Sequence, residues 1–180
     1  MLWIALAFAE PNEAVLEPHR TEVAVGRGER AVEVARQHLG TPYRWEGRGT
    51  QRLPGYDCLG ILFRAWGRVD GRPWTTYEVN PSQLVAHGKL GAPVSGLEGV
   101  LRDDLPDLAS LRPGDVLYFL LEGYTIPDEP LLVRGEARYW PWHTGLYAGS
   151  GIVLHASPGG EVMEQPLDEM RFDALFVTRP

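Results

Sequence analysis

Residues 57–67 read DCLGILFRAWG, and this stretch carries the strongest structural signal in the chain. Its apolar side chains fall on one face at helical spacing, namely Ile61, Leu62, Ala65 and Trp66. Asp57 is well suited to cap a helix, because its carboxylate can accept hydrogen bonds from the free N–H groups of the first turn. The pattern predicts a helix from Leu59 to about Gly67 that opens at Asp57 or Cys58.

Cys58 is the only cysteine of the chain, which excludes an internal disulfide and a four-cysteine zinc site. A helix start presents unpaired N–H groups and the positive end of the helix dipole, and both stabilise a thiolate. We therefore expect the pKa of Cys58 to lie below the free-thiol value of about 8.5, with a nucleophilic role for the side chain. Gly60 would leave room for a substrate to approach the helix start. The alternative is a buried cysteine that acts as a small hydrophobic residue.

A second helix is expected upstream, from Gly28 to Leu39, since Gly40 and Pro42 follow it. Its apolar face would contain Ala31, Val34, Ala35, His38 and Leu39. Residues 1–27 are expected to form a separate N-terminal segment, with an apolar run over Leu2–Ala9 and then a charged, proline-containing tether. The run is short and no Lys or Arg precedes it, so it is either an atypical export signal or an extra strand.

The second half of the chain turns from helices to strands. Residues 70–110 are expected to be irregular, with a short helix around 81–85, because glycines and prolines interrupt any longer element. Strands are predicted over residues 115–121, 143–148, 152–156, 161–165 and 174–178, with a hairpin turn at Gly149-Ser150-Gly151. Helices followed by consecutive strands indicate an α+β fold with an antiparallel sheet, in one domain over residues 28–180.

Two of the five histidines, His143 and His155, lie 12 residues apart on the two arms of this hairpin. A register centred on residue 149 would place them directly opposite each other on one face, with Cβ atoms roughly 5 Å apart. We expect both side chains to project toward Cys58 and to supply a base and the group that orients it. The alternative is two unrelated strand histidines, because a register shift of one residue would put them on opposite faces.

The composition is that of an acidic globular protein. Hydrophobic residues make up 44% of the 180 residues, and 24 acidic against 17 basic side chains give a net charge of -7. Such a chain is poorly suited to binding nucleic acid through phosphate contacts. No stretch reaches the roughly 20 apolar residues that span a bilayer, so no stable membrane insertion is expected.

Several motifs, in order along the chain, resemble the NlpC/P60 family of papain-like cysteine peptidases: GTPYRW (40–45), DCLG (57–60), LRPGDV (111–116), HTGLY (143–147), LHA (154–156) and RFDALFVTRP (171–180). The resemblance runs from about Arg27 to Pro180. It implies a papain-like fold in which N-terminal helices, the nucleophile helix among them, pack on an antiparallel sheet. It also implies Cys58 as nucleophile, His143 as general base and His155 as its orienting partner. The hydroxyl of Tyr43 would lie beside the nucleophile and support the oxyanion site.

The activity that the resemblance implies is cleavage of amide bonds in peptidoglycan stem peptides, often between D-glutamate and a diamino acid, by acyl transfer through Cys58. Substrate contacts are expected from Trp45, Asp57 and Trp142. The partner would be a stem peptide or a related small peptide, in the cell envelope or alternatively in the cytoplasm, and no oligomeric state is indicated. The alternatives are a thiol hydrolase of small acyl substrates and a catalytically silent module that binds cell-wall peptide.

No cofactor is expected. Cys58, His143 and His155 form a ligand set that zinc would accept, but a cysteine at a helix start fits the nucleophile role better. We therefore predict no metal site.

Three features depart from the family pattern. Leu59 stands where a serine usually follows the nucleophile. Glu46-Gly47 replaces the usual pair of glycines, and the loop from Arg48 to Tyr56 is longer than usual. An insertion extends over about residues 122–142. It would form either a wall or lid over the cleft, or a solvated loop whose aromatic side chains pack on the sheet edge.

Overall fold

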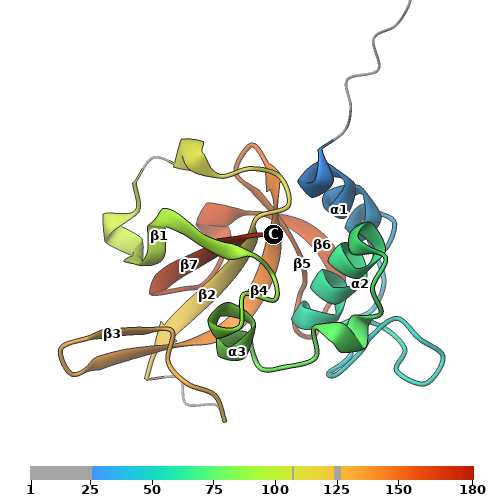
Figure 1. The fold of residues 1–180 in the computed structure, drawn as a ribbon, viewed down its shortest axis with the longest axis horizontal. Helices are drawn as coiled ribbons and strands as arrows, with labels where there is room; N and C mark the ends of the chain where they lie inside the picture. Colours follow the sequence, from blue (N-terminus) through green and yellow to red (C-terminus); the bar gives the residue numbers. More distant parts are fainter. Residues whose placement is uncertain (1–25, 107, 124–126) are drawn as a thin grey trace, which may run out of the picture.

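The computed structural model describes residues 26–106, 108–123 and 127–180 of the chain (Figure 1). The apolar run and nearly all of the predicted tether, residues 1–25, lie outside the described residues. Among the helices that are described, none is long and apolar enough to cross a membrane.

Helices occupy the first part of the described chain and strands the second. The helices are α1 (Arg27–Arg36), α2 (Cys58–Asp70) and α3 (Pro81–Ala86). Short 3-10 helices are η1 (Trp74–Thr76), η2 (Arg102–Asp104), η3 (Leu108–Ser110) and η4 (Leu167–Glu169). The strands are β1 (Ala92–Leu101), β2 (Val116–Glu122), β3 (Leu132–Arg134), β4 (Ala137–Gly149), β5 (Ile152–Ala156), β6 (Val162–Pro166) and β7 (Ala174–Arg179).

The strands form one antiparallel sheet in the order β1-β7-β2-β4-β5-β6. The short strand β3 is outside this order and pairs with the beginning of β4. The helices α1 and α2 pack against each other and against β4 and β5 (Figure 1). The predicted α+β class, with helices packed on an antiparallel sheet, is therefore confirmed. The packing also brings α2, which begins at Cys58, next to β4, the strand that carries His143.

Both faces of the sheet are covered, which explains the uninterrupted apolar run of β2. Val116, Tyr118 and Leu120 pack in the core that α1 and α2 share with the sheet. Leu117 and Phe119 belong to a second core on the opposite face, together with residues of β1 and of the segment before β7. A strand buried on both faces reads as continuously hydrophobic rather than alternating.

The strand β1 contradicts the expectation that residues 70–110 are irregular apart from one short helix. Gly96 and Gly99 look like strand breakers, yet both have positive φ, 82° and 84°. They lie where the pairing of β1 with β7 shifts register, between Pro93 and Val100. Glycine tolerates the left-handed backbone of such bulges, so these residues bend the strand without ending it.

The first helix also differs from its prediction. It ends at Arg36 rather than Leu39, and it buries Ala31, Val32 and Ala35. Leu39, expected on the buried face, is 46% exposed. The chain leaves the helix early because the N–H of Gly40 donates to the carbonyl of Val162 at the start of β6.

Candidate active site

Cys58 is the first residue of α2, and Asp57 is its N-cap, as predicted. The Asp57 Oδ1 atom accepts from the N–H of Gly60 at 2.6 Å, and Oδ2 accepts from the N–H of Glu46 at 3.0 Å. The carboxylate therefore ties the preceding loop to the helix start. This double anchor holds the backbone around Cys58 in place.

Arg48 completes this anchor, and the sequence analysis did not identify it. Its guanidinium donates to Asp57 Oδ1 at 2.7 Å and to the carbonyl of Gly47 at 2.9 Å. Both side chains of the ion pair are only 8% exposed. Asp57 lines the cleft as expected of a substrate contact, but its oxygens are already engaged inside the protein, so its contact with substrate stays a prediction.

Gly60 does not provide the space for substrate that its position suggested. A Cβ atom at this position would lie 2.0 Å from the carbonyl oxygen of Gly47 and 3.2 Å from Asp57 Oδ1. The missing side chain thus lets the loop before α2 pack directly on the helix.

His143 and His155 lie on one face of the sheet and contact each other. Nε2 of His143 is 2.7 Å from Nδ1 of His155, with the rings nearly perpendicular. Their predicted direct opposition is wrong, because Leu146 pairs with Leu154 and this register sets His155 opposite Gly145. The two histidines are diagonal neighbours, which keeps them on the same face.

Gly145 makes this diagonal contact possible. A Cβ at this position would lie 2.6 Å from a methyl group of Val153 and 3.3 Å from the Cβ of His155. Its backbone has no positive φ, so close approach of β5 is the reason for a glycine in the HTG motif.

Cys58 and His143 line one cleft with a volume of about 490 Å³. The residue pairs that the structure shows between β4 and β5 start at Leu146, so His143 lies on β4 outside this paired region. Thr144 lines the same cleft and contacts the Cys58 thiol. Because neighbouring strand residues point to opposite faces, His143 and Thr144 approach the cleft from the two sides of β4.

One ring nitrogen of His143 makes no hydrogen bond to the described residues. His143 is only 2% exposed, and its Nδ1 atom is buried without a hydrogen-bond partner in the described part of the chain. Its ring packs against Phe119 and Trp142, at centroid distances of 6.1 Å and 5.1 Å. Two aromatic contacts therefore fix the ring, while Nδ1 makes no hydrogen bond to the described residues.

The surroundings of Cys58 and His143 keep both side chains uncharged. Burial of the thiol, followed by the charge of the Asp57 carboxylate, raises the pKa of Cys58 to about 11, although contacts with Thr144 and Leu59 act in the opposite direction. Burial, followed by the neighbouring His155, lowers the pKa of His143 to about 3. The expected lowering of the Cys58 pKa is therefore wrong, since desolvation outweighs the helix dipole. At neutral pH the resting pair is a thiol and a neutral imidazole.

The alkylation rate of Cys58 is expected to rise with pH toward an inflection near 11, because the thiolate is the reactive form. At neutral pH iodoacetamide should modify Cys58 more slowly than free cysteine, whose pKa is about 8.5. The Asp57→Asn variant should move the inflection to lower pH, because it removes the nearby negative charge while retaining an N-cap side chain. An inflection below about 8.5 in the unmodified protein would mean that the helix dipole dominates.

Segment 127–128 and β4 build one side of the cleft. Pro127, Asp128 and Trp142 line it. The backbone carbonyl of Pro127 accepts from the side-chain amide of Asn80, and the Asp128 carboxylate accepts from Ser82 at the start of α3. Within the 122–142 segment, residues 127–128 and Trp142 thus form a wall of the cleft, and residues 132–134 and 137–142 belong to β3 and β4.

The two predicted tryptophans both line the cleft, in different settings. Trp45 is 79% exposed and forms the rim. Trp142 is half-buried, and its indole N–H donates to the carbonyl of Arg171 at 2.9 Å. Tyr43 is partly buried against the main core and is not among the described residues that line the cleft. Its role beside the nucleophile stays a prediction.

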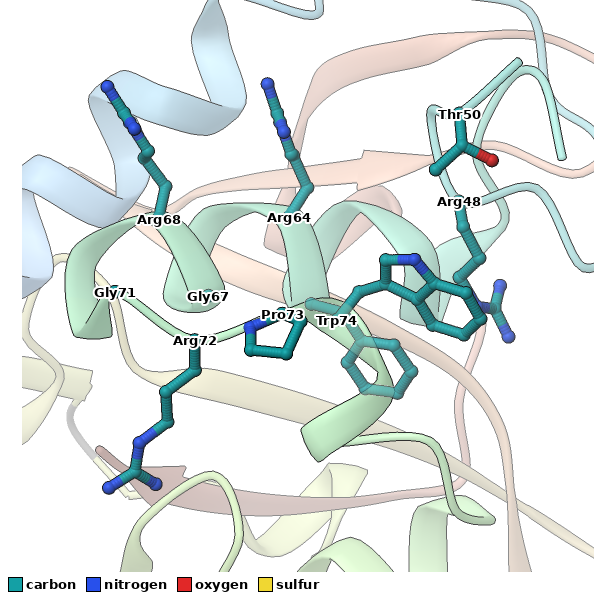
Figure 2. Close-up of a pocket in the computed structure, with 10 residues that line it drawn as sticks. Arg48, Thr50, Arg64, Gly67, Arg68, Gly71, Arg72, Pro73 and Trp74 are labelled. Atoms are coloured by element: carbon teal, nitrogen blue, oxygen red, sulfur yellow. The ribbon is translucent and has the colours of Figure 1, made fainter. Parts of the chain in front are cut away.

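A second hollow, of about 340 Å³, has Arg48 and three further arginines in its lining, Arg64, Arg68 and Arg72. Figure 2 shows Arg64 and Arg68 extending together to one side of α2, whereas Arg72 extends to the other side. The Arg48 guanidinium instead lies 5.8 Å from the ring centroid of Trp74. Because the guanidinium groups do not converge, we assign no anion site to this hollow.

Comparison with curated proteins finds relatives named as endopeptidases. The probable endopeptidase YafL of Escherichia coli is 27% identical over 160 residues, which cover 87% of this chain and 49% of that protein. The probable endopeptidase Rv2190c of Mycobacterium tuberculosis is 29% identical over 139 residues, which cover 76% of this chain and 26% of that protein. The chain thus spans about half of the first relative and about a quarter of the second. No family model matches the chain.

Comparison with solved structures finds NlpC/P60 domains. NlpC1 from Trichomonas vaginalis aligns with a TM-score of 0.54 and 25% identity, over 84% of this chain and 43% of that chain. The NlpC/p60 domain of the peptidoglycan hydrolase SagA aligns with a TM-score of 0.52 and 21% identity, over 85% of this chain and 98% of that domain. RipD of Mycobacterium tuberculosis, described as a non-catalytic NlpC/p60 domain protein, aligns with a TM-score of 0.50 and 18% identity, over 86% and 97%. The resemblance carried by the sequence motifs is therefore confirmed in three dimensions, and the chain has the NlpC/P60 fold.

Proposed function

We propose that this chain is a thiol hydrolase that cleaves amide bonds in the peptide stems of peptidoglycan. The observation that carries the proposal is the cleft that Cys58, the only cysteine, shares with a buried His143 whose Nδ1 is unengaged. Relatives named as probable endopeptidases and the NlpC/p60 domain of a peptidoglycan hydrolase support the substrate class.

The proposed reaction is acyl transfer. Sγ of Cys58 attacks the amide carbonyl carbon while its proton passes to Nδ1 of His143. The tetrahedral intermediate then collapses, the C–N bond breaks, and His143 gives the proton to the leaving amine. Water hydrolyses the thioester with His143 again acting as the base. Because the resting pair is neutral, the thiolate forms only as His143 takes the proton.

The oxyanion of the intermediate needs hydrogen-bond donors close to Sγ. The backbone N–H of Cys58 belongs to the first turn of α2, whose N–H groups have no acceptor within the helix. We propose this N–H as one donor and, from the family resemblance, the hydroxyl of Tyr43 as a second.

We further propose that the scissile bond joins D-glutamate to a diamino acid. The charge of the cleft supports this choice, because Glu46 and Glu78 line it in addition to the Arg48–Asp57 ion pair. Carboxylates near the reacting carbonyl would complement the side-chain ammonium of a diamino acid.

The test is incubation of the protein with purified peptidoglycan and with free stem peptides, followed by mass spectrometry of the products. New fragments cut at the D-glutamate–diamino acid bond are expected with the wild type and not with Cys58→Ala. Cleavage of a different amide or ester would retain the thiol hydrolase and reject the proposed bond. Binding without cleavage would reject the hydrolase and favour a silent binding module.

The Trp45→Ala variant is expected to raise KM by roughly 5- to 20-fold with little change in kcat. The indole is 79% exposed at the rim of the cleft, so it can add contact area for the substrate without touching the reacting atoms. Its loss should leave the free energy of unfolding within about 0.5 kcal/mol of the wild-type value. The control is Leu39→Ala, which removes another exposed apolar side chain outside the cleft lining. An unchanged KM in Trp45→Ala would remove Trp45 from the substrate contacts.

A further inference from the structure

A third polar side chain continues the line from His143 through His155. Oε1 of Gln165, on β6, is 3.2 Å from Nε2 of His155. Val153 pairs with Gln165 and His155 pairs with Met163, so Gln165 is the diagonal neighbour of His155 on the same face. His143, His155 and Gln165 therefore follow one another across the adjacent strands β4, β5 and β6.

We propose that Gln165 is a positioning residue that places a proton on Nε2 of both histidines and so leaves Nδ1 of His143 as the basic atom in the cleft. Its effect on turnover rests on the proposed hydrolase function. The protonation pattern itself does not.

The orientation of the Gln165 amide is fixed by its second contact. Its Nε2 atom lies 3.3 Å from the backbone carbonyl oxygen of Glu169. A carbonyl oxygen only accepts, so the amide nitrogen must face Glu169. The amide oxygen then faces His155, and the opposite assignment would set two acceptors against each other at Glu169.

The proton positions follow from this orientation. An amide oxygen only accepts, so Nε2 of His155 must carry a hydrogen. A neutral imidazole has one donor and one acceptor nitrogen, which makes Nδ1 of His155 an acceptor. Nε2 of His143, at 2.7 Å, must therefore donate to it. Nδ1 of His143 is then left with its lone pair.

This order of protons decides whether the cleft contains a base. If Nδ1 of His155 carried the proton instead, Nε2 of His143 would have to accept, and the His143 proton would lie on Nδ1. That atom could not then take the thiol proton of Cys58. Both histidines are held neutral, because burial lowers the pKa of each, so the choice is between two tautomers.

The absence of a partner at Nδ1 of His143 agrees with this protonation pattern. Among the described residues, no acceptor or donor meets this buried atom. Orphaned buried N–H groups are rarer in proteins than under-satisfied acceptors, so an unpartnered buried nitrogen fits a lone pair better than an N–H. The unpartnered atom therefore fits the tautomer that Gln165 imposes.

The experiment is NMR of the protein with ¹⁵N-labelled histidine, in which protonated and unprotonated ring nitrogens have distinct chemical shifts. In the wild type, Nδ1 of His143 and Nδ1 of His155 are expected to be unprotonated. Gln165→Met, which has similar length and no acceptor oxygen, should populate the opposite tautomer of both rings. Gln165→Glu gives up the donation to Glu169 but retains an acceptor for Nε2 of His155, so it should keep the wild-type tautomers. Glu164→Gln is the control, because this neighbour on β6 pairs with Arg36 instead.

The same variants separate this inference from the proposed function. With a cleavable stem peptide, Gln165→Met should lower kcat about 10- to 100-fold at an unchanged KM, and Gln165→Glu should restore most of it. Wild-type tautomers and wild-type kcat in folded Gln165→Met would overturn the inference and leave the hydrolase intact. If the wild type cleaves nothing, the proposed function fails and the NMR pattern still decides the inference. If Gln165→Met does not fold, a protonated Nδ1 of His143 in the wild type would overturn the inference, and an unprotonated one would support it.

Discussion

Replacing Cys58 or His143 by alanine is expected to lower turnover of peptidoglycan stem peptides by about 10⁴-fold or more, with equal losses for the two single variants. The losses should be equal because the thiol and the imidazole act as one unit. With a Cys58 pKa of about 11, the thiol has almost no thiolate at neutral pH unless His143 takes its proton. The double variant should therefore be no slower than either single one. Mass spectrometry of the released fragments measures the initial rate.

His155→Gln is expected to keep far more activity, within about 100-fold of the wild type. His155 accepts from Nε2 of His143 at 2.7 Å, and an amide oxygen can accept in its place. The roles are reversed if His155→Gln is as inactive as Cys58→Ala while His143→Gln still turns over. Normal hydrolysis by Cys58→Ala, His143→Ala and His155→Gln alike would place the activity elsewhere and favour a binding module.

Gly60→Ala is expected to lower the free energy of unfolding by about 2 kcal/mol or more and to abolish most of the activity. In an exposed helix the same substitution would stabilise by up to about 1 kcal/mol, because alanine has the higher helix propensity. The sign is reversed here because the new Cβ would lie 2.0 Å from the carbonyl oxygen of Gly47, a backbone atom that cannot turn away. Relieving this contact would move the loop that carries Arg48 away from the start of α2.

Gly160→Ala is the matched control for this substitution. Its Cβ would meet its nearest neighbours at 3.6 Å, an ordinary contact, and its backbone φ is not positive. Urea unfolding of the two variants should therefore separate them clearly. Equal stability of Gly60→Ala and the wild type would show that the loop yields, and a wild-type rate of fragment release would show that its position does not matter for catalysis.

Local patterns in the sequence were sufficient for most of the fold. The helical face of residues 57–67 and the N-cap at Asp57 determine where α2 starts, since both depend only on neighbours within a few residues. The glycine turn predicts the hairpin of β4 and β5, but the register shift in β4 between Tyr147 and Gly149 is what places His143 and His155 on the same face. The strand β1 could not be found this way, because its glycines become bulges only when β7 is paired alongside.

The chemistry of the site depended on residues that no local pattern brings together. Asp57 was recognisable as a cap, but its ion pair with Arg48 exists only because the loop before α2 folds back onto the helix. Gln165 reaches His155 only through the register of β5 and β6. Neither partner has a sequence signal, because each contact joins different elements of the folded chain.

The sequence by itself determined where the groups of the proposed chemistry stand: one cysteine at the start of a helix and two histidines on the arms of one hairpin. Only the tertiary structure decided their protonation. The helix start alone would lower the pKa of Cys58, but packing buries the thiol next to the Asp57 carboxylate and raises it instead. Position along the chain sets the helix dipole, whereas desolvation depends on everything that packs around the atom, so its sign emerges only once the chain is folded.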